Sequence, residues 1–217
     1  EGLKRAYLFA SKMCATVAVL GAGMMWMFGQ PFLQRWIPAH ALEAWLVMMP
    51  AVLPKALFIA QTPSMVLLLA QARHRRLAEI DWVAGACNLA MTWWLARAMG
   101  APGAAWATCV EQSLVCGLVW PFLGARAAEL PFWKVWGSLL LLPVARATLV
   151  LLPCLALIPF ARPDYLWLTG IGLISCAWFL AGNALLLSAE EKEWAVKIMP
   201  FLKRFSRKKD ASSGNPV

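Results

Sequence analysis

The chain has 217 residues, of which 61% are apolar and 14% are charged, and its formal net charge is +9. Ordinary soluble domains contain about 45–50% apolar and about 25% charged residues, so the composition argues against a soluble fold. It also excludes a disordered basic tail, because such tails lack apolar residues to bury. A helix needs about 20 residues to cross hydrocarbon, so six crossings leave no room for a sizeable soluble domain.

Six long apolar segments follow one another along the chain. They lack the two-residue alternation of a barrel strand. Helices also satisfy every backbone polar group within lipid. We therefore predict an all-α fold, a polytopic transmembrane bundle of about six helices. In chain order, the spans are predicted at residues 13–28, 44–69, 80–99, 103–123, 135–160 and 166–188.

The first two spans differ in how they are interrupted. The first is predicted to end at Gly29-Gln30-Pro31, because proline breaks a helix interior. The second carries Lys55 near its middle and is interrupted by Pro50, Pro54 and Pro63. An ionised residue in hydrocarbon costs at least about 2.5–3.5 kcal/mol, so it usually faces a cavity or a partner. Lys55 is therefore a predicted substrate-binding residue, although its long side chain can also snorkel to the interface.

The third and fourth spans carry two polar residues at membrane depth, Asn88 and Glu111. A buried carboxylate is a candidate for exchanging a coupling ion, which is the role we predict for Glu111. The alternative is that Glu111 pairs with Lys55 or Arg146 and only supports packing. Asn88 is predicted to join neighbouring helices through hydrogen bonds.

A tight turn is predicted between these two spans, at Gly100-Ala101-Pro102-Gly103. Gly103 and Ala107 are four residues apart and therefore share one face of the fourth helix. Small residues on a helix face allow two backbones to approach closely within the membrane. We predict that Gly100, Gly103 and Ala107 are packing positions.

The fifth span carries Arg146 between Pro143 and Pro153. Helices broken by proline often line the substrate path of transporters. Arg146 is therefore the second predicted substrate-binding residue, and a cavity with Lys55 and Arg146 would accept phosphate or carboxylate groups. Asn183 in the sixth span is predicted to pack against neighbouring helices.

The composition changes abruptly after residue 188. We divide the chain into a six-span transmembrane region at residues 1–188 and a basic tail at residues 189–217. Apolar residues recur there at helical spacing, which predicts a short amphipathic helix on an anionic membrane surface. Residues 210–217 are small and polar and are predicted to be disordered.

Lysine and arginine residues alternate between the two sides of the predicted bundle. Fifteen precede the first span or follow the second, fourth and sixth spans, whereas the other connections carry only Arg35, Arg97 and Arg162. Because cytoplasmic loops carry the excess of positive residues, both ends are predicted to face the cytoplasm. The pattern is typical of a multi-pass protein of the plasma membrane.

Residues for catalysis are scarce. An active site needs a convergent set of acids, bases, nucleophiles or metal ligands, and the two histidines, His40 and His74, lie on opposite predicted sides. The six cysteines form no C-x-x-C pair and have no neighbouring histidine. We predict that the chain is not an enzyme and has no cofactor or metal. Its basic tail is also typical of nucleic-acid binding, but beside a membrane span it favours anchoring, so no nucleic-acid partner is predicted.

Three stretches resemble the C-terminal half of polysaccharide flippases of the multidrug/oligosaccharidyl-lipid/polysaccharide exporter superfamily. They are residues 28–37, residues 68–78 and, as the third, residues 88–89 followed by the glycine and alanine turn of residues 99–108. Ala72 stands where the family usually has glycine. Members of this family have about twelve to fourteen spans in two lobes, so the resemblance implies that this chain is one lobe and that an N-terminal lobe is missing. Lys55 and Arg146 lie outside the three stretches.

The leading hypothesis is a flippase of the bacterial plasma membrane that translocates a lipid-linked oligosaccharide by alternating access. Its partners would be the lipid-linked saccharide, membrane lipids and the other lobe. A second hypothesis is a membrane-embedded transferase or polymerase of envelope polysaccharide, with Glu79 and Asp81 as its only acidic cluster. A third is a multidrug exporter of the same superfamily, which two buried cations against one buried acid disfavour.

Overall fold

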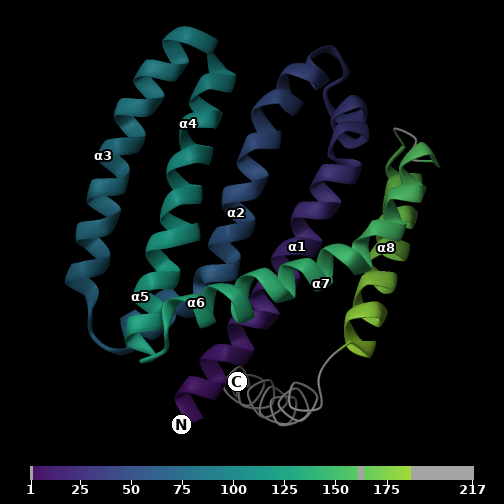
Figure 1. Cartoon of the computed structure of the whole chain (residues 1–217). Coiled ribbons are helices and arrows are strands. Elements are labelled where there is room, and N and C mark those ends of the chain that lie inside the picture. Colours follow the sequence, from purple (N-terminus) through teal and green to yellow (C-terminus); the bar gives the residue numbers. More distant parts are fainter. Residues whose placement is uncertain (1, 161–163, 187–217) are drawn as a thin grey trace, which may run out of the picture.

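The computed structural model of the chain describes residues 2–160 and 164–186 (Figure 1). All regular secondary structure within these ranges is helical. Five helices are long and apolar enough to cross a membrane. The predicted all-α polytopic bundle is therefore confirmed. The amphipathic helix and the disordered end predicted for the basic tail lie outside the described residues.

Helices α1 (Gly2–Trp36) and α2 (Ala41–Ala70) form an antiparallel pair joined by the short helix η1 (Pro38–His40). The predicted break at Gly29-Gln30-Pro31 is wrong, because α1 continues through Pro31 to Trp36. Proline removes only one backbone donor, and buried Phe28 and Leu33 hold the helix on both sides of it. Helix α2 likewise runs unbroken through its three prolines.

The connection from α2 to the next helix contains Ala72, whose φ is 55°. This left-handed conformation costs a residue with a Cβ roughly 1–2 kcal/mol, and glycine adopts it freely. The turn therefore has a backbone conformation that favours glycine, although the residue there is alanine.

Helices α3 (His74–Met99) and α4 (Ala101–Leu114) form a hairpin joined by Gly100 alone. Gly100 has φ +68°, and a Cβ on Gly103 would lie 2.1 Å from the carbonyl oxygen of Leu95. Ala107, one turn further, is 0% exposed. The α3 and α4 backbones thus touch where only glycine fits.

Helix α4 continues through a π-helical segment, η2 (Val115–Val119), into α5 (Trp120–Ala127). Together they form one span of 27 residues. Helix α3 is not among the five most apolar helices, yet its 26 residues rise about 39 Å against a hydrocarbon core of about 30 Å. Because α3 lies along α4 (Figure 1), it covers the same membrane thickness, as a sixth crossing requires.

The predicted fifth span is divided into four helical segments. They are α6 (Phe132–Val135), the π-helical η3 (Trp136–Leu141), α7 (Leu142–Leu151) and the 3₁₀-helical η4 (Leu152–Phe160). Prolines in α7 and η4 remove backbone donors, which favours these irregular segments. Figure 1 shows α7 running obliquely across α1 towards the last helix, α8 (Tyr165–Leu185).

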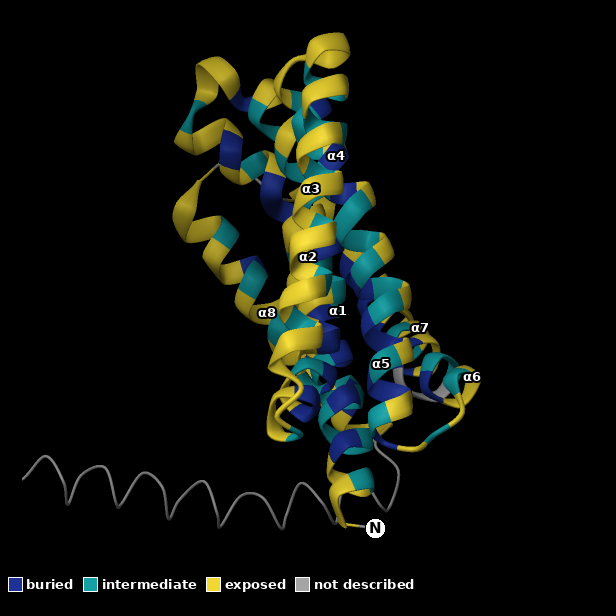
Figure 2. Ribbon diagram, turned by 90° about the vertical axis from the view of Figure 1, so that its left-hand side faces the viewer, coloured by how far each residue is buried: buried dark blue, intermediate teal, exposed yellow. Residues whose placement is uncertain are grey.

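The core of the bundle follows α1, which packs against α2, α7 and α8. Where α1 crosses α2, Ala15, Ala18 and Ala60 are 0%, 3% and 4% exposed, so small residues bring the two backbones together. Figure 2 shows that α3 is exposed along most of its length, and none of its residues is buried. The face of α3 turned away from α4 is therefore free within the described part of the chain.

Candidate functional site

A polar groove lies between α2, α3 and the long helix α4–η2–α5. Its volume is about 610 Å³. Phe58 and Met65 of α2 line one side, and Asp81 and Asn88 of α3 line the other. Helices α2 and α3 each pack on α4 but contact one another only weakly, which leaves the groove open between them.

The centre of the groove is a hydrogen-bonded network around Asn88. Its Nδ2 donates to Glu111 Oε2 at 3.2 Å and to Thr108 Oγ1 at 3.4 Å. Thr92 Oγ1 donates to Asn88 Oδ1 at 3.2 Å, and Thr108 Oγ1 donates to the carbonyl of Ala104 at 3.3 Å. The network joins α3 to α4 and fixes the position of the Glu111 carboxylate.

This network has more acceptors than donors. The amide hydrogens of Asn88 and the hydroxyl hydrogens of Thr92 and Thr108 are all used in the bonds above. Among the described residues, Glu111 Oε1 receives no hydrogen bond, and the buried Oε1 of Gln112 in the groove wall has no hydrogen-bond partner. A group of oxygen atoms with vacant lone pairs is suited to binding a proton or a cation.

Lys55 lies beside this groove without lining it. It is exposed on α2 and makes no ion pair with a described residue. It stands three residues before Phe58, which lines the groove, so the two side chains share one face of α2. Lys55 is therefore close to the groove, where two acids face one neighbouring cation.

Arg146 lies elsewhere in the bundle, between α7 and α8. Its Nη1 donates to the carbonyl of Leu186 at 3.3 Å, directly after the end of α8. A cation at a helix C-terminus is stabilised by the unpaired carbonyls there. The structure does not bring Lys55 and Arg146 into one pocket, and their role in substrate binding stays a prediction.

The predicted polar residues have partners other than those expected. Glu111 accepts a hydrogen bond from Asn88, and within the described ranges it forms no ion pair with Lys55 or Arg146. Asn88 does join two helices, as its residue type favours. Asn183 is buried, as a packing residue is, and it donates to the carbonyl of Phe179 in its own helix at 3.0 Å.

Thr92, Thr108 and Gln112 belong to the groove but were not predicted from the sequence. The signal for them is their spacing. Thr92 follows Asn88 by four residues and Thr108 precedes Glu111 by three, so each threonine shares a helix face with a polar residue at membrane depth. Threonine is common in membrane helices, so spacing alone does not single out these two residues. They are identified only because α3 and α4 pack against each other in the structure.

A second hollow, of about 560 Å³, lies between α1, α2 and the α7–η4 segment. Its lining is apolar and contains one hydroxyl, that of Thr148. None of the predicted substrate-binding or ion-coupling residues lines it.

The acidic cluster near the start of α3 is divided by the fold. Glu79 Oε1 accepts a hydrogen bond from Arg75 Nε at 2.9 Å on the exposed surface, whereas Asp81 lines the polar groove. No group of three or more His, Cys, Asp or Glu side chains within residues 2–160 and 164–186 is arranged to hold a metal ion.

Comparisons with known proteins add no relative. Neither a protein-family model, nor a curated protein, nor a solved structure matches the chain. The geometry therefore supports one general conclusion: a helical membrane protein with a polar, acceptor-rich groove between its helices.

Proposed function

We propose that the chain is one lobe of a flippase that translocates a lipid-linked oligosaccharide across the bacterial plasma membrane by alternating access. The observation that carries the proposal is the polar groove of Asn88, Thr108 and Glu111 among helices apolar enough to cross a membrane. Polar groups at membrane depth are costly and usually mark a substrate or ion path. The resemblance of residues 28–37, 68–78, 88–89 and 99–108 to polysaccharide flippases supports the same function.

Glu111 is the proposed ion-coupling residue. Its carboxylate is held by one donor, Asn88 Nδ2, at 3.2 Å, and retains lone pairs for a proton or a monovalent cation. Binding of a cation neutralises a charge at membrane depth, which lowers the cost of moving the α3–α4 hairpin. Helix α4 packs on α2, whereas α3 contacts α2 only weakly, so α3 is the part of the hairpin that α2 restrains least when the charge changes.

Lys55 is the proposed contact for the anionic part of the substrate, because it is exposed beside the groove and forms no ion pair with a described residue. Arg146 remains a second candidate through its fork of donors, although it also supports the end of α8. Both ends of the chain are proposed to be cytoplasmic, and an N-terminal lobe is the proposed partner across the substrate path.

The test is transport of a fluorescent lipid-linked oligosaccharide in proteoliposomes that contain the complete gene product. Glu111→Gln is expected to reduce transport driven by a proton or sodium gradient by at least about tenfold, on the order of 1.4 kcal/mol. Glu79→Gln is the matched control, because Glu79 is an exposed acid paired with Arg75 outside the groove. Equal transport by both variants contradicts the role of Glu111.

The cationic contacts are tested in the same vesicles with the double variant Lys55→Gln, Arg146→Gln. Reduced affinity for the substrate, with unchanged protein insertion, is the expected result. Normal transport removes both residues from the substrate site. If affinity is reduced, the two single variants show whether the amine of Lys55 or the guanidinium of Arg146 is responsible.

A multidrug exporter of the same superfamily is the second candidate, and the groove gives it a specific argument. The sequence pointed to two cations against one acid, whereas Asp81 and Glu111 line the groove and no lysine or arginine among the described residues does. An acidic groove attracts organic cations. Resistance to cationic dyes, lost in Asp81→Asn, would favour the exporter over the flippase.

The transferase or polymerase is the third candidate. Of its two proposed acidic residues, Asp81 lines the groove, whereas Glu79 is paired with Arg75 at the surface. Sugar-chain elongation by the purified protein, lost in Asp81→Asn, would establish it.

A further inference from the structure

A row of exposed apolar side chains follows the outer face of α4–η2–α5 and ends at a positive charge. Val110, Leu114, Leu118 and Phe122 are 41%, 54%, 49% and 47% exposed. Each is four residues from the next, and Arg126, also exposed, continues the spacing. From Leu114 to Phe122 the helix rises about 12 Å, which fits within one leaflet of about 15 Å, half of the hydrocarbon core.

Aromatic rings from two helices surround the charged end of this row. The Arg126 guanidinium carbon lies 5.8 Å from the ring centre of Phe122. Phe122 makes an edge contact with Phe132 at 6.1 Å, and Phe132 contacts Trp133 at 5.1 Å. Trp133 is 78% exposed and is followed by Lys134. We name Phe122, Arg126, Phe132, Trp133 and Lys134 the Arg126 corner.

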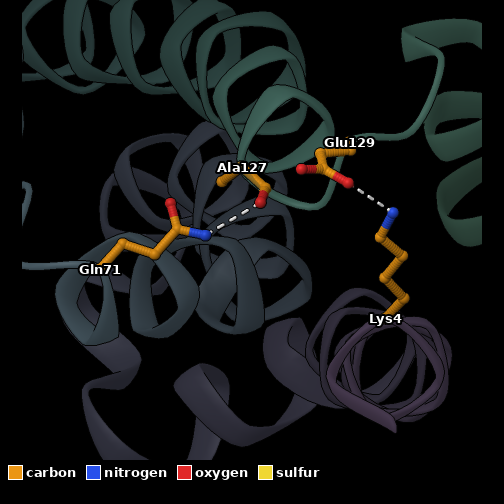
Figure 3. Close-up of polar contacts among 4 residues, drawn as sticks. All are labelled: Lys4, Gln71, Ala127 and Glu129. Atoms are coloured by element: carbon orange, nitrogen blue, oxygen red, sulfur yellow. Dashed lines mark hydrogen bonds and ion pairs between the residues drawn. The ribbon is translucent and has the colours of Figure 1, made fainter. Parts of the chain in front are cut away.

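The positive charge of Arg126 is not neutralised by the acid nearest to it in the chain. The carboxylate of Glu129 turns instead to α1, where Oε2 accepts a hydrogen bond from Lys4 Nζ at 2.7 Å (Figure 3). Gln71 Nε2 donates to the carbonyl of Ala127 at 2.9 Å and holds the end of α5 in place. Within the described residues, Arg126 contacts an aromatic ring and forms no ion pair.

We propose that the Arg126 corner binds an anionic phospholipid. The phosphate lies at the Arg126 guanidinium, and an acyl chain follows Phe122, Leu118 and Leu114. A guanidinium that lies over a ring and pairs with no carboxylate keeps N–H groups available, and these bind phosphate with two bonds. Tryptophan is enriched at the level of the headgroups, and basic sites beside membrane helices bind acidic lipids. The proposal requires a membrane protein but not a flippase.

The test uses the purified chain in neutral detergent and follows thermal unfolding by circular dichroism. Phosphatidylglycerol is expected to raise the Tm by roughly 3 °C more than phosphatidylcholine with the same acyl chains. Arg126→Gln is expected to remove at least half of that difference. Arg97→Gln is the matched control, because Arg97 is also exposed and lies 3.9 Å from the ring centre of Trp93, on the other hairpin helix.

Native mass spectrometry supplies an independent readout if Arg126→Gln unfolds. Arg126→Lys, which keeps the charge but loses the paired donors, is then compared with the original chain for the number of phosphatidylglycerol molecules retained, and fewer are expected. Equal Tm increases from the two lipids, or from inorganic phosphate, contradict the proposal. The same increase in Arg126→Gln as in the original chain also contradicts it, since the site would then be elsewhere.

Discussion

Glu129 is an exposed residue whose ionisation depends on one partner. The Lys4 ammonium donates a hydrogen bond to this carboxylate and adds its positive charge, and both effects lower the pKa of Glu129. Because the pKa in the folded chain is below that of the unfolded chain, about 4.3, the pair stabilises the fold above that value. The stabilisation is lost as the pH falls through the lowered pKa of Glu129.

Lys4→Gln is therefore expected to raise the pKa of Glu129 towards its ordinary value. The measurement is a carbon-13 NMR titration of labelled glutamate carboxyls in detergent. An unchanged Glu129 titration in the variant would show that Lys4 is not the cause. Little change in Tm at neutral pH is expected, because solvent screens an exposed ion pair and leaves it a small net contribution to stability.

For single residues, the sequence predicts the depth in the membrane better than it predicts the hydrogen-bonding partner. Asn88 and Glu111 interrupt apolar runs, so their position within the bundle could be predicted from hydropathy alone. Their contact depends on the register of α3 against α4, which the one-residue turn at Gly100 and the close approach at Gly103 determine. For Arg146 the hydrogen-bonding partner could not be predicted, because the end of α8 is 40 residues away in the chain.

Among the elements, the α3–α4 hairpin depends most on a single side-chain volume. A Cβ at Gly103 would meet the Leu95 carbonyl oxygen at 2.1 Å, and a backbone atom cannot move aside as a flexible side chain can. Gly103→Ala is expected to lower the free energy of unfolding by about 1–3 kcal/mol or more. The measurement is equilibrium unfolding of the purified chain in sodium dodecyl sulfate.

Gly85→Ala serves as the control for this hairpin, because a Cβ at Gly85 meets nothing within 4 Å. Alanine has the higher helix propensity, so this substitution is expected to be neutral or to stabilise by up to about 1 kcal/mol. Equal destabilisation by both substitutions would mean that the hairpin does not depend on the contact with Leu95.

Prolines show why element boundaries were harder to predict than elements. Helices α1 and α2 continue through four prolines, since large contact surfaces with each other hold them straight enough. The fifth span packs less extensively on α1 and α8, and there the backbone changes to π-helical and 3₁₀ segments. A proline marks a missing hydrogen bond, and the surrounding packing determines whether the helix ends.

For the whole molecule, charge distribution and helix geometry lead to the same arrangement by separate arguments. The lysine and arginine pattern requires an even number of crossings, and five helices satisfy length and apolarity. Helix α3 is long enough to be the sixth, although its groove-facing polar residues reduce its hydropathy. A purely hydropathic count misses such a helix because the polar residues that line the groove also make the helix less apolar.

Membrane sidedness is tested by single cysteines in a background with all six native cysteines replaced. The three sites, Ala39, Ala72 and Ala101, are exposed residues at successive helix connections. An impermeant maleimide added outside intact cells is expected to label Ala39→Cys and Ala101→Cys, and to label Ala72→Cys only after the membrane is opened. If α3 did not cross, Ala72→Cys and Ala101→Cys would be labelled from the same side. That outcome would place Asn88 outside the hydrocarbon, where its polar network could not take part in carrying an ion across the membrane.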